Sequence, residues 1–142
     1  MNHTTLLLIP VFVQVALTFA LLFRLGPARV AAVKSGEVKL EDIALGQRAW
    51  PDRITQISNA YANQFEMPVL FYALVVLAIV TGRVDMVLVA GAWLFALSRL
   101  AHAYVYVTSN RIRARFNAFT LGVFGLMAMW IWFAWRVLME GV

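Results

Sequence analysis

Four long apolar stretches dominate this sequence, and shorter segments with charged or turn-forming residues separate them. Each stretch is long enough to cross the roughly 30 Å hydrocarbon core of a bilayer as a helix, which rises about 1.5 Å per residue. Hydrophobic residues make up 63% of the chain and charged residues 13%, which leaves too much apolar surface for a soluble domain. The sequence therefore predicts an all-α membrane protein, a single domain built as a four-transmembrane-helix bundle.

The segments between the apolar stretches indicate where the helices begin and end. A polar segment over 24–53 follows the first stretch, and its Gly36 and Pro51 indicate turns. The turn over 81–85 is short enough to force the helices on either side of it into an antiparallel hairpin. Asn110 is a favourable N-cap for the last helix. The predicted helices cover approximately residues 5–23, 54–80, 86–107 and 111–138.

The basic residues predict the orientation of the bundle. Nine of the twelve Lys and Arg residues lie in the first and third loops, namely Arg24, Arg29, Lys34, Lys39, Arg48, Arg53, Arg111, Arg113 and Arg115. The positive-inside rule then places both loops in the cytosol and both termini outside, in a multi-pass protein of the inner (cytoplasmic) membrane. The net charge of +5 is better explained by contacts with membrane lipid than by nucleic-acid binding. Because the chain has no Cys, a disulfide, a cysteine nucleophile and a thiolate metal site are excluded, and no metal site is expected.

Two stripes of polar residues run along the second and third predicted helices, with members spaced three and four residues apart: Asn59, Asn63 and Glu66, then Arg99, His102 and Tyr106. Glu66 lies 17 residues before Arg83, at the centre of the hairpin, and Arg99 lies 16 residues after it. The remaining residues of the two stripes match as closely in their sequence distances from Arg83. The stripes therefore predict three pairs at equal depth, which are Glu66 with Arg99, Asn63 with His102, and Asn59 with Tyr106.

These polar groups lie within one leaflet, where ionisable side chains are costly and normally face the bundle interior. An ion pair between Glu66 and Arg99 could act merely as a clamp between helices. The group as a whole favours a cavity for a polar ligand, because so many polar side chains need partners. Arg111 and Arg115 fall four residues apart, at the end of the two polar stripes that lies next to the third loop. Guanidinium groups at this position suit carboxylates or a thiolate. Arg113 is interpreted as a topology determinant.

The same residues resemble the motifs of the MAPEG family (membrane-associated proteins in eicosanoid and glutathione metabolism). Residues 63–68 read Asn-Gln-Phe-Glu-Met-Pro, similar to the family's Asn-x-x-Glu followed closely by Pro. Arg99, His102 and Tyr106 are similar to its Arg-x-x-His-x-x-x-Tyr. With the basic residues that open the last helix, the likeness to a bacterial-type member extends over nearly the whole chain.

The resemblance implies a homotrimer that binds glutathione, as co-substrate, between neighbouring subunits near the cytosolic face. The glutathione contacts that it implies are Asn63, Glu66, Arg99, His102, Tyr106, Arg111, Arg115 and Arg29. Arg115, or alternatively Arg111, would stabilise the thiolate, and Tyr106 would act on the substrate. Eicosanoid-forming members carry arginines where this chain has Asn59 and Ala62, so two anchors for the carboxylates of glutathione are missing.

The function that the resemblance implies is a glutathione-dependent membrane transferase or peroxidase. Its substrate would be a lipophilic electrophile or a lipid hydroperoxide that enters from the membrane. A second interpretation is a non-catalytic lipid-binding or scaffold protein with the same fold. A small multidrug transporter fits less well, because four-helix transporters carry an essential acid in the first helix and this chain has none there.

Overall fold

The computed structural model describes residues 2–46 and 49–140, and it is helical, with no strand in these two ranges. Arg48, one of the basic residues counted above, lies outside the described residues. Four helical segments are long and apolar enough to cross a membrane, namely His3–Lys34, Asp52–Val80, Met86–Val107 and Ile112–Met139. The chain is therefore an integral multi-pass membrane protein, and the predicted four-helix fold class is confirmed.

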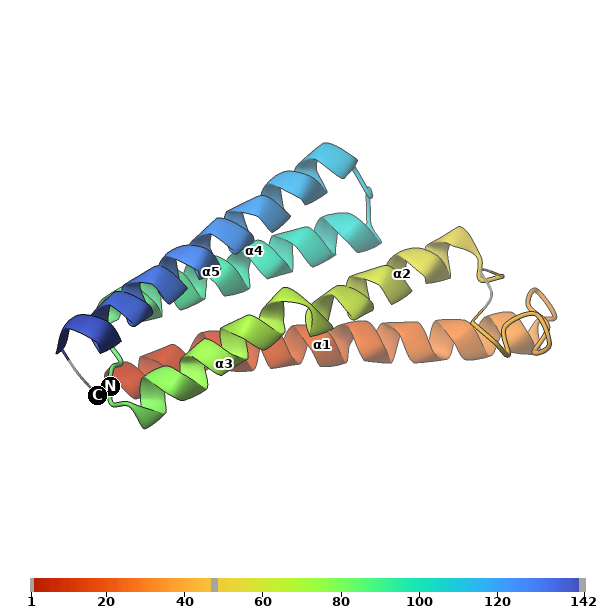
Figure 1. Cartoon of the computed structure of the whole chain (residues 1–142). Coiled ribbons are helices and arrows are strands. Elements are labelled where there is room, and N and C mark those ends of the chain that lie inside the picture. The colour runs from red at the N-terminus through yellow and green to blue at the C-terminus, as the bar shows by residue number, and fades with distance from the viewer. Residues whose placement is uncertain (1, 47–48, 141–142) are drawn as a thin grey trace.

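The helices form two layers (Figure 1). In one layer, α1 (His3–Lys34) packs against α2 (Asp52–Ala62) and then against α3 (Met67–Val80). In the other, α4 (Met86–Val107) and α5 (Ile112–Glu140) form an antiparallel pair with the most extensive contacts in the described chain. An apolar core joins the layers, and within it the rings of Phe71 and Phe95 stack with centroids 4.8 Å apart.

The described residues of α1 extend well beyond the predicted end near Phe23. The prediction followed apolar character, which marks where the hydrocarbon core ends and not where the helix ends. The helix continues through Pro27 and stops at the turn around Gly36, whose φ of +76° favours glycine. These last turns of α1 pack against α2 through a small apolar cluster of Leu25, Ala32, Val38, Ile54 and Ile57.

The second span, predicted as one helix, is interrupted. Between α2 and α3 lies a single 3-10 turn, η1 (Asn63–Phe65), followed by Glu66 with φ −101° and ψ −101°. Pro68 explains the interruption, because it has no N–H to donate and its ring would clash with the carbonyl of Gln64 in a regular helix. The break leaves the backbone carbonyl of Asn63 available for a partner outside its own helix.

A buried amide pair fastens α1 to the interrupted span. Nε2 of Gln14 donates to Oε1 of Gln64 at 2.7 Å, and Nε2 of Gln64 donates to the carbonyl of Ala60 at 2.8 Å. Both glutamine side chains are buried. Hydrogen bonds of this kind hold spans together where water is absent. Gln14 interrupts an apolar stretch of the sequence, but nothing in the sequence indicates which residue it bonds.

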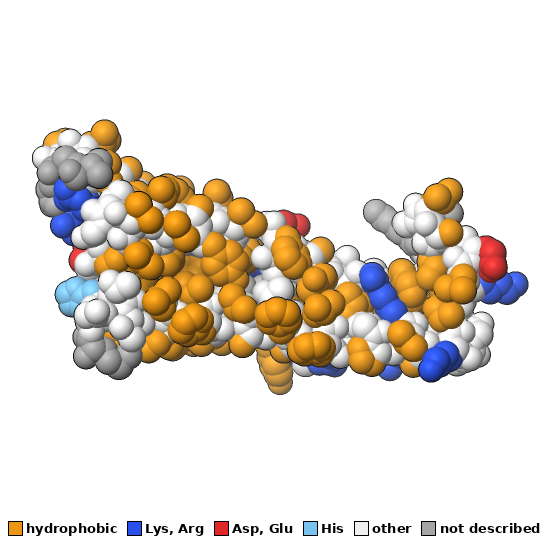
Figure 2. Space-filling model, turned by 90° about the horizontal axis from the view of Figure 1, so that it is seen from below, with side chains coloured by type: hydrophobic (Ala, Val, Ile, Leu, Met, Phe, Trp, Pro, Cys, Tyr) orange, Lys and Arg blue, Asp and Glu red, His pale blue; other side chains and the backbone are white. Residues whose placement is uncertain are grey.

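The face drawn in Figure 2 is mostly apolar, and its basic side chains lie at one end and along the opposite half. Phe12, Phe124 and Ile131 are 63%, 58% and 64% exposed, respectively. So many exposed apolar side chains fit a surface in contact with lipid, because a water-soluble protein would bury most of them.

Candidate functional site

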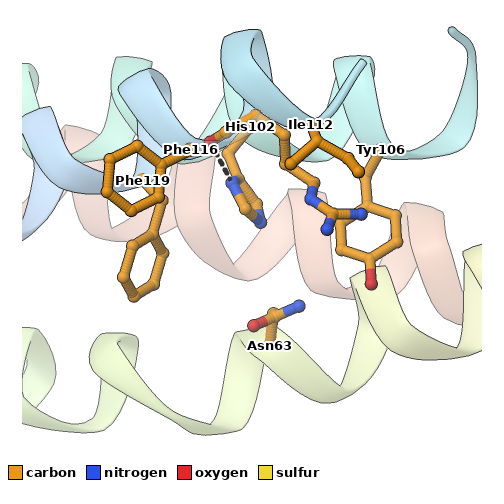
Figure 3. A pocket seen from close by; sticks show the side chains of 7 residues that line it. Asn63, His102, Tyr106, Ile112, Phe116 and Phe119 are labelled. Carbon is orange, nitrogen blue, oxygen red and sulfur yellow. Dashed lines mark hydrogen bonds between the residues drawn. The ribbon is translucent and has the colours of Figure 1, made fainter. Parts of the chain in front are cut away.

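A pocket of about 290 Å³ lies between η1, α4 and the first turns of α5 (Figure 3). It brings together four of the predicted site residues, Asn63, His102, Tyr106 and Arg115. Its other lining residues are Ile112, Phe116 and Phe119, all from α5. The pocket therefore has polar groups from three helical segments and an apolar wall from one.

His102 is held through one ring nitrogen and leaves the other without a partner. Its Nδ1 lies 3.0 Å from the backbone carbonyl oxygen of Arg115. Because a carbonyl can only accept, Nδ1 carries the proton, and Nε2 of the neutral ring is an acceptor. Nε2 is buried and has no hydrogen-bond partner within the described residues. The ring points toward Asn63 across the pocket (Figure 3), so it offers an acceptor to a ligand there.

Arg115 is fixed on two sides. Its Nη1 donates to Oδ1 of Asn110 at 2.7 Å, and its Cζ lies 4.1 Å from the centroid of the Tyr106 ring. No carboxylate of the described chain lies within 4.0 Å of its nitrogens. The cation–π contact orients the guanidinium without neutralising it. Arg115 is therefore a positioned, uncompensated cation at the pocket wall.

Two further pocket residues present unpaired polar atoms. Nδ2 of Asn63 donates to the carbonyl of Asn59 at 2.9 Å, which leaves its Oδ1 without a partner in the described chain. The hydroxyl of Tyr106 likewise makes no hydrogen bond to any described residue. An acceptor oxygen and a hydroxyl are thus available beside Arg115 and His102.

Arg99 is 1% exposed and supports the pocket from behind. Its Nη2 donates to the backbone carbonyl of Asn63 at 3.0 Å, and its Cζ lies 5.9 Å from the centroid of the Phe119 ring. Glu66 is close enough to attract this cation, but it is exposed and forms no ion pair with Arg99 within 4.0 Å. The expected ion pair is therefore wrong: Arg99 meets the carbonyl that the Pro68 break makes available, one turn from Glu66.

Asn63 and His102, which the sequence places at equal depth, line the same pocket. Besides Arg99, three predicted site residues do not line it. Glu66 lies exposed between η1 and α3, and Arg111 lies exposed before α5. Arg29 lines a separate pocket of about 370 Å³ at the end of α1, where its Nη2 donates to Oγ of Ser58 at 2.9 Å.

Sequence reasoning missed the apolar wall and the role of Asn110. Ile112, Phe116 and Phe119 follow a spacing of four and three residues, the helical pattern that revealed the polar stripes. The sequence predicts that the Asn110 side chain caps α5 by accepting a hydrogen bond from a backbone N–H of that helix. Its amide oxygen instead accepts a hydrogen bond from the Arg115 side chain. The five-residue separation of Asn110 and Arg115 crosses a loop, and no periodicity rule covers it.

The sequence model of the MAPEG family matches residues 7–135. The matched range includes all seven residues that line the pocket. No curated protein and no solved structure matches the chain.

Proposed function

The chain belongs to the MAPEG family, and on that basis we propose that it is a glutathione-dependent membrane transferase or peroxidase. Its substrates would be lipophilic electrophiles or lipid hydroperoxides. Membership supports a glutathione-related function in general, and the pocket beside Arg115 supports the more specific proposal.

The chemistry of the pocket fits glutathione. Glutathione carries carboxylates, amide N–H groups and a thiol. Arg115 suits an anionic group, and the unpaired Nε2 of His102 and Oδ1 of Asn63 suit N–H donors. The observation that carries the proposal is the fixed guanidinium of Arg115, which has no acidic partner in the described chain and lies beside these unpaired atoms.

Glutathione would supply a thiol, whose ionised form is the nucleophile. Arg115 favours that form, because a nearby cation lowers the pKa of a thiol. Tyr106 lies under the Arg115 guanidinium, with its hydroxyl available to donate a proton or a hydrogen bond to the substrate. The wall of Ile112, Phe116 and Phe119 excludes water and suits the apolar part of a substrate.

The remaining predicted residues have supporting roles in this proposal. Arg99 holds the backbone at Asn63 in place through its hydrogen bond to the carbonyl. Glu66, Arg111 and Arg29 lie outside the pocket, so they would reach glutathione from a neighbouring subunit of the expected homotrimer. Native mass spectrometry tests the trimer, and a preparation that contains only monomers or dimers would count against it.

The thermal unfolding of the protein in detergent tests glutathione binding. A ligand that binds only the folded state raises the unfolding temperature in a saturable way. We expect such a rise with glutathione, together with turnover of chlorodinitrobenzene or linoleic acid hydroperoxide. The absence of both would contradict the proposal and favour a non-catalytic lipid-binding or scaffold protein. The replacement of two family arginines by Asn59 and Ala62 is the observation that favours this second candidate.

We also propose that both termini face the outside of an inner membrane and that the loops over 35–51 and 108–111 face the cytosol. The support is the concentration of basic residues in and beside these loops. Single cysteines introduced at His3 and at Lys39 should react with impermeant reagents from opposite sides of the membrane. Reaction from the same side would contradict this orientation.

A further inference from the structure

Asn110 closes the turn between α4 and α5 in an unusual backbone conformation. Its φ is +47°, in the left-handed region, and its N–H donates to the carbonyl of Val105 at 2.7 Å. Asn is among the few residues besides Gly that enter this region readily. The conformation brings the Asn110 side chain to Arg115 in the first turns of α5.

The contact with Asn110 restricts the Arg115 guanidinium from one edge, while Tyr106 restricts it from one face. The hydrogen bond measures 2.7 Å between Nη1 and Oδ1, and the ring centroid lies 4.1 Å from Cζ. A flexible arginine side chain loses much conformational entropy when a ligand fixes it. A guanidinium that is already held loses less, so it binds an anion more tightly.

The hydrogen bond from Arg115 to Asn110, which we call the tether, has a neutral acceptor. This property distinguishes it from an ion pair. A carboxylate at position 110 would hold Arg115 equally well, but it would also compensate the positive charge. An amide oxygen orients the guanidinium and leaves its charge available to a ligand. We propose that Asn110 is a positioning residue, which holds the Arg115 guanidinium over Tyr106 without neutralising it so that the cation stabilises the thiolate of glutathione. This inference rests on the proposed function.

Two substitutions at Asn110 separate the tether from the turn. Asn110→Gly keeps a residue that tolerates positive φ but removes the amide, and Asn110→Asp keeps an acceptor but adds a charge. The apparent pKa of the bound thiol is measured from the ultraviolet absorbance of the thiolate. We expect Asn110→Gly to raise it by about 0.5–1 unit, the equivalent of one hydrogen bond, and Asn110→Asp to raise it further. Ser109→Ala, in the same turn, is the matched control and should leave it unchanged.

A second measurement needs no glutathione. Phenylglyoxal modifies arginine, and mass spectrometry reports the rate at Arg115 separately. Release from Asn110 should increase that rate about fivefold in Asn110→Gly at a temperature where the variant is fully folded. An unchanged rate would overturn the inference whether or not glutathione binds. If the rate rises but wild-type protein binds no glutathione, the tether stands and the proposed function fails. If glutathione binds and both variants keep the wild-type thiol pKa, Asn110 only closes the turn and the inference is overturned.

Discussion

Two polar clusters lie at opposite ends of the α4–α5 pair, and they differ in how their polar atoms are satisfied. At the end with the turn over 81–85, Asp85 accepts hydrogen bonds from the backbone of Leu88, from Nε1 of Trp132 and from Nη1 of Arg136. At the other end, Asn110 and Tyr106 hold Arg115 and the carbonyl of Arg115 holds His102, yet both side chains have unpaired capacity toward the pocket. A cluster that satisfies itself fixes helices, whereas a cluster with unpaired polar atoms around a cavity suits a ligand.

The largest effect on stability is expected at the cluster around Asp85, which we call the closed cluster because its polar atoms satisfy one another. Asp85→Ala removes the N-cap of α4 together with the contacts to α5, so unfolding should be easier by about 2–3 kcal/mol. Unfolding in detergent measures the loss, and Asp42→Ala, an exposed loop carboxylate, is the control. Glutathione binding should be unchanged. A variant with normal stability and weaker glutathione binding would reverse the assignment of the two clusters.

The closed cluster should also make stability depend on pH. Burial alone would raise the pKa of Asp85, but the hydrogen bonds from Leu88, Trp132 and Arg136 together lower it below its usual value of 3.8. A carboxylate with a lowered pKa stabilises the fold above its unfolded-state pKa, and this contribution is lost as the pH falls through the folded-state pKa. The unfolding temperature should therefore decrease between about pH 5 and pH 3, and less so in Asp85→Asn. Parallel curves for the two proteins would count against the cluster as a stabilising feature.

The cluster of Arg115 and His102, which we call the open cluster, should show the opposite pattern, a large change in binding with a small change in stability. Arg115→Gln should weaken glutathione binding about tenfold, since it removes a charge-assisted hydrogen bond. Its unfolding should change by no more than about 1 kcal/mol, because the substitution removes the contacts with Asn110 and Tyr106 but leaves no ion-pair partner behind. Arg113→Gln, two residues away and exposed, is the matched control. Equal losses in the two variants would indicate diffuse attraction by a basic surface.

The smallest effect is expected at Glu66, which belongs to neither cluster. It is exposed and makes no ion pair, so Glu66→Gln should change the free energy of unfolding by about 0–0.5 kcal/mol. An ion pair between Glu66 and Arg99, which their matching depths in the sequence predict, would give a larger value. A loss of about 3 kcal/mol or more would mean that the two side chains pair in the membrane.

The two clusters also show which features of the structure can be predicted from the sequence. Apolar length predicted four spans, and helical spacing predicted one depth for Asn63 and His102, which line the same pocket. Both predictions depend on regular geometry along a helix. The Pro68 break, the exposed position of Glu66 and the extension of α1 to Lys34 depend on local backbone conformation. The contacts of Asn110 and of Asp85 with α5 cross loops, where spacing carries no information about which side chains meet.

The binding of radiolabelled glutathione, measured by equilibrium dialysis, compares the two clusters most directly. Wild-type protein, Arg115→Gln and Asp85→Asn would be dialysed in the same detergent at a temperature where all three are folded. We expect saturable binding to wild type and to Asp85→Asn, and binding weakened about tenfold in Arg115→Gln. No saturable binding to wild type, or equal binding to wild type and Arg115→Gln, would contradict the claim that the open cluster is the glutathione site.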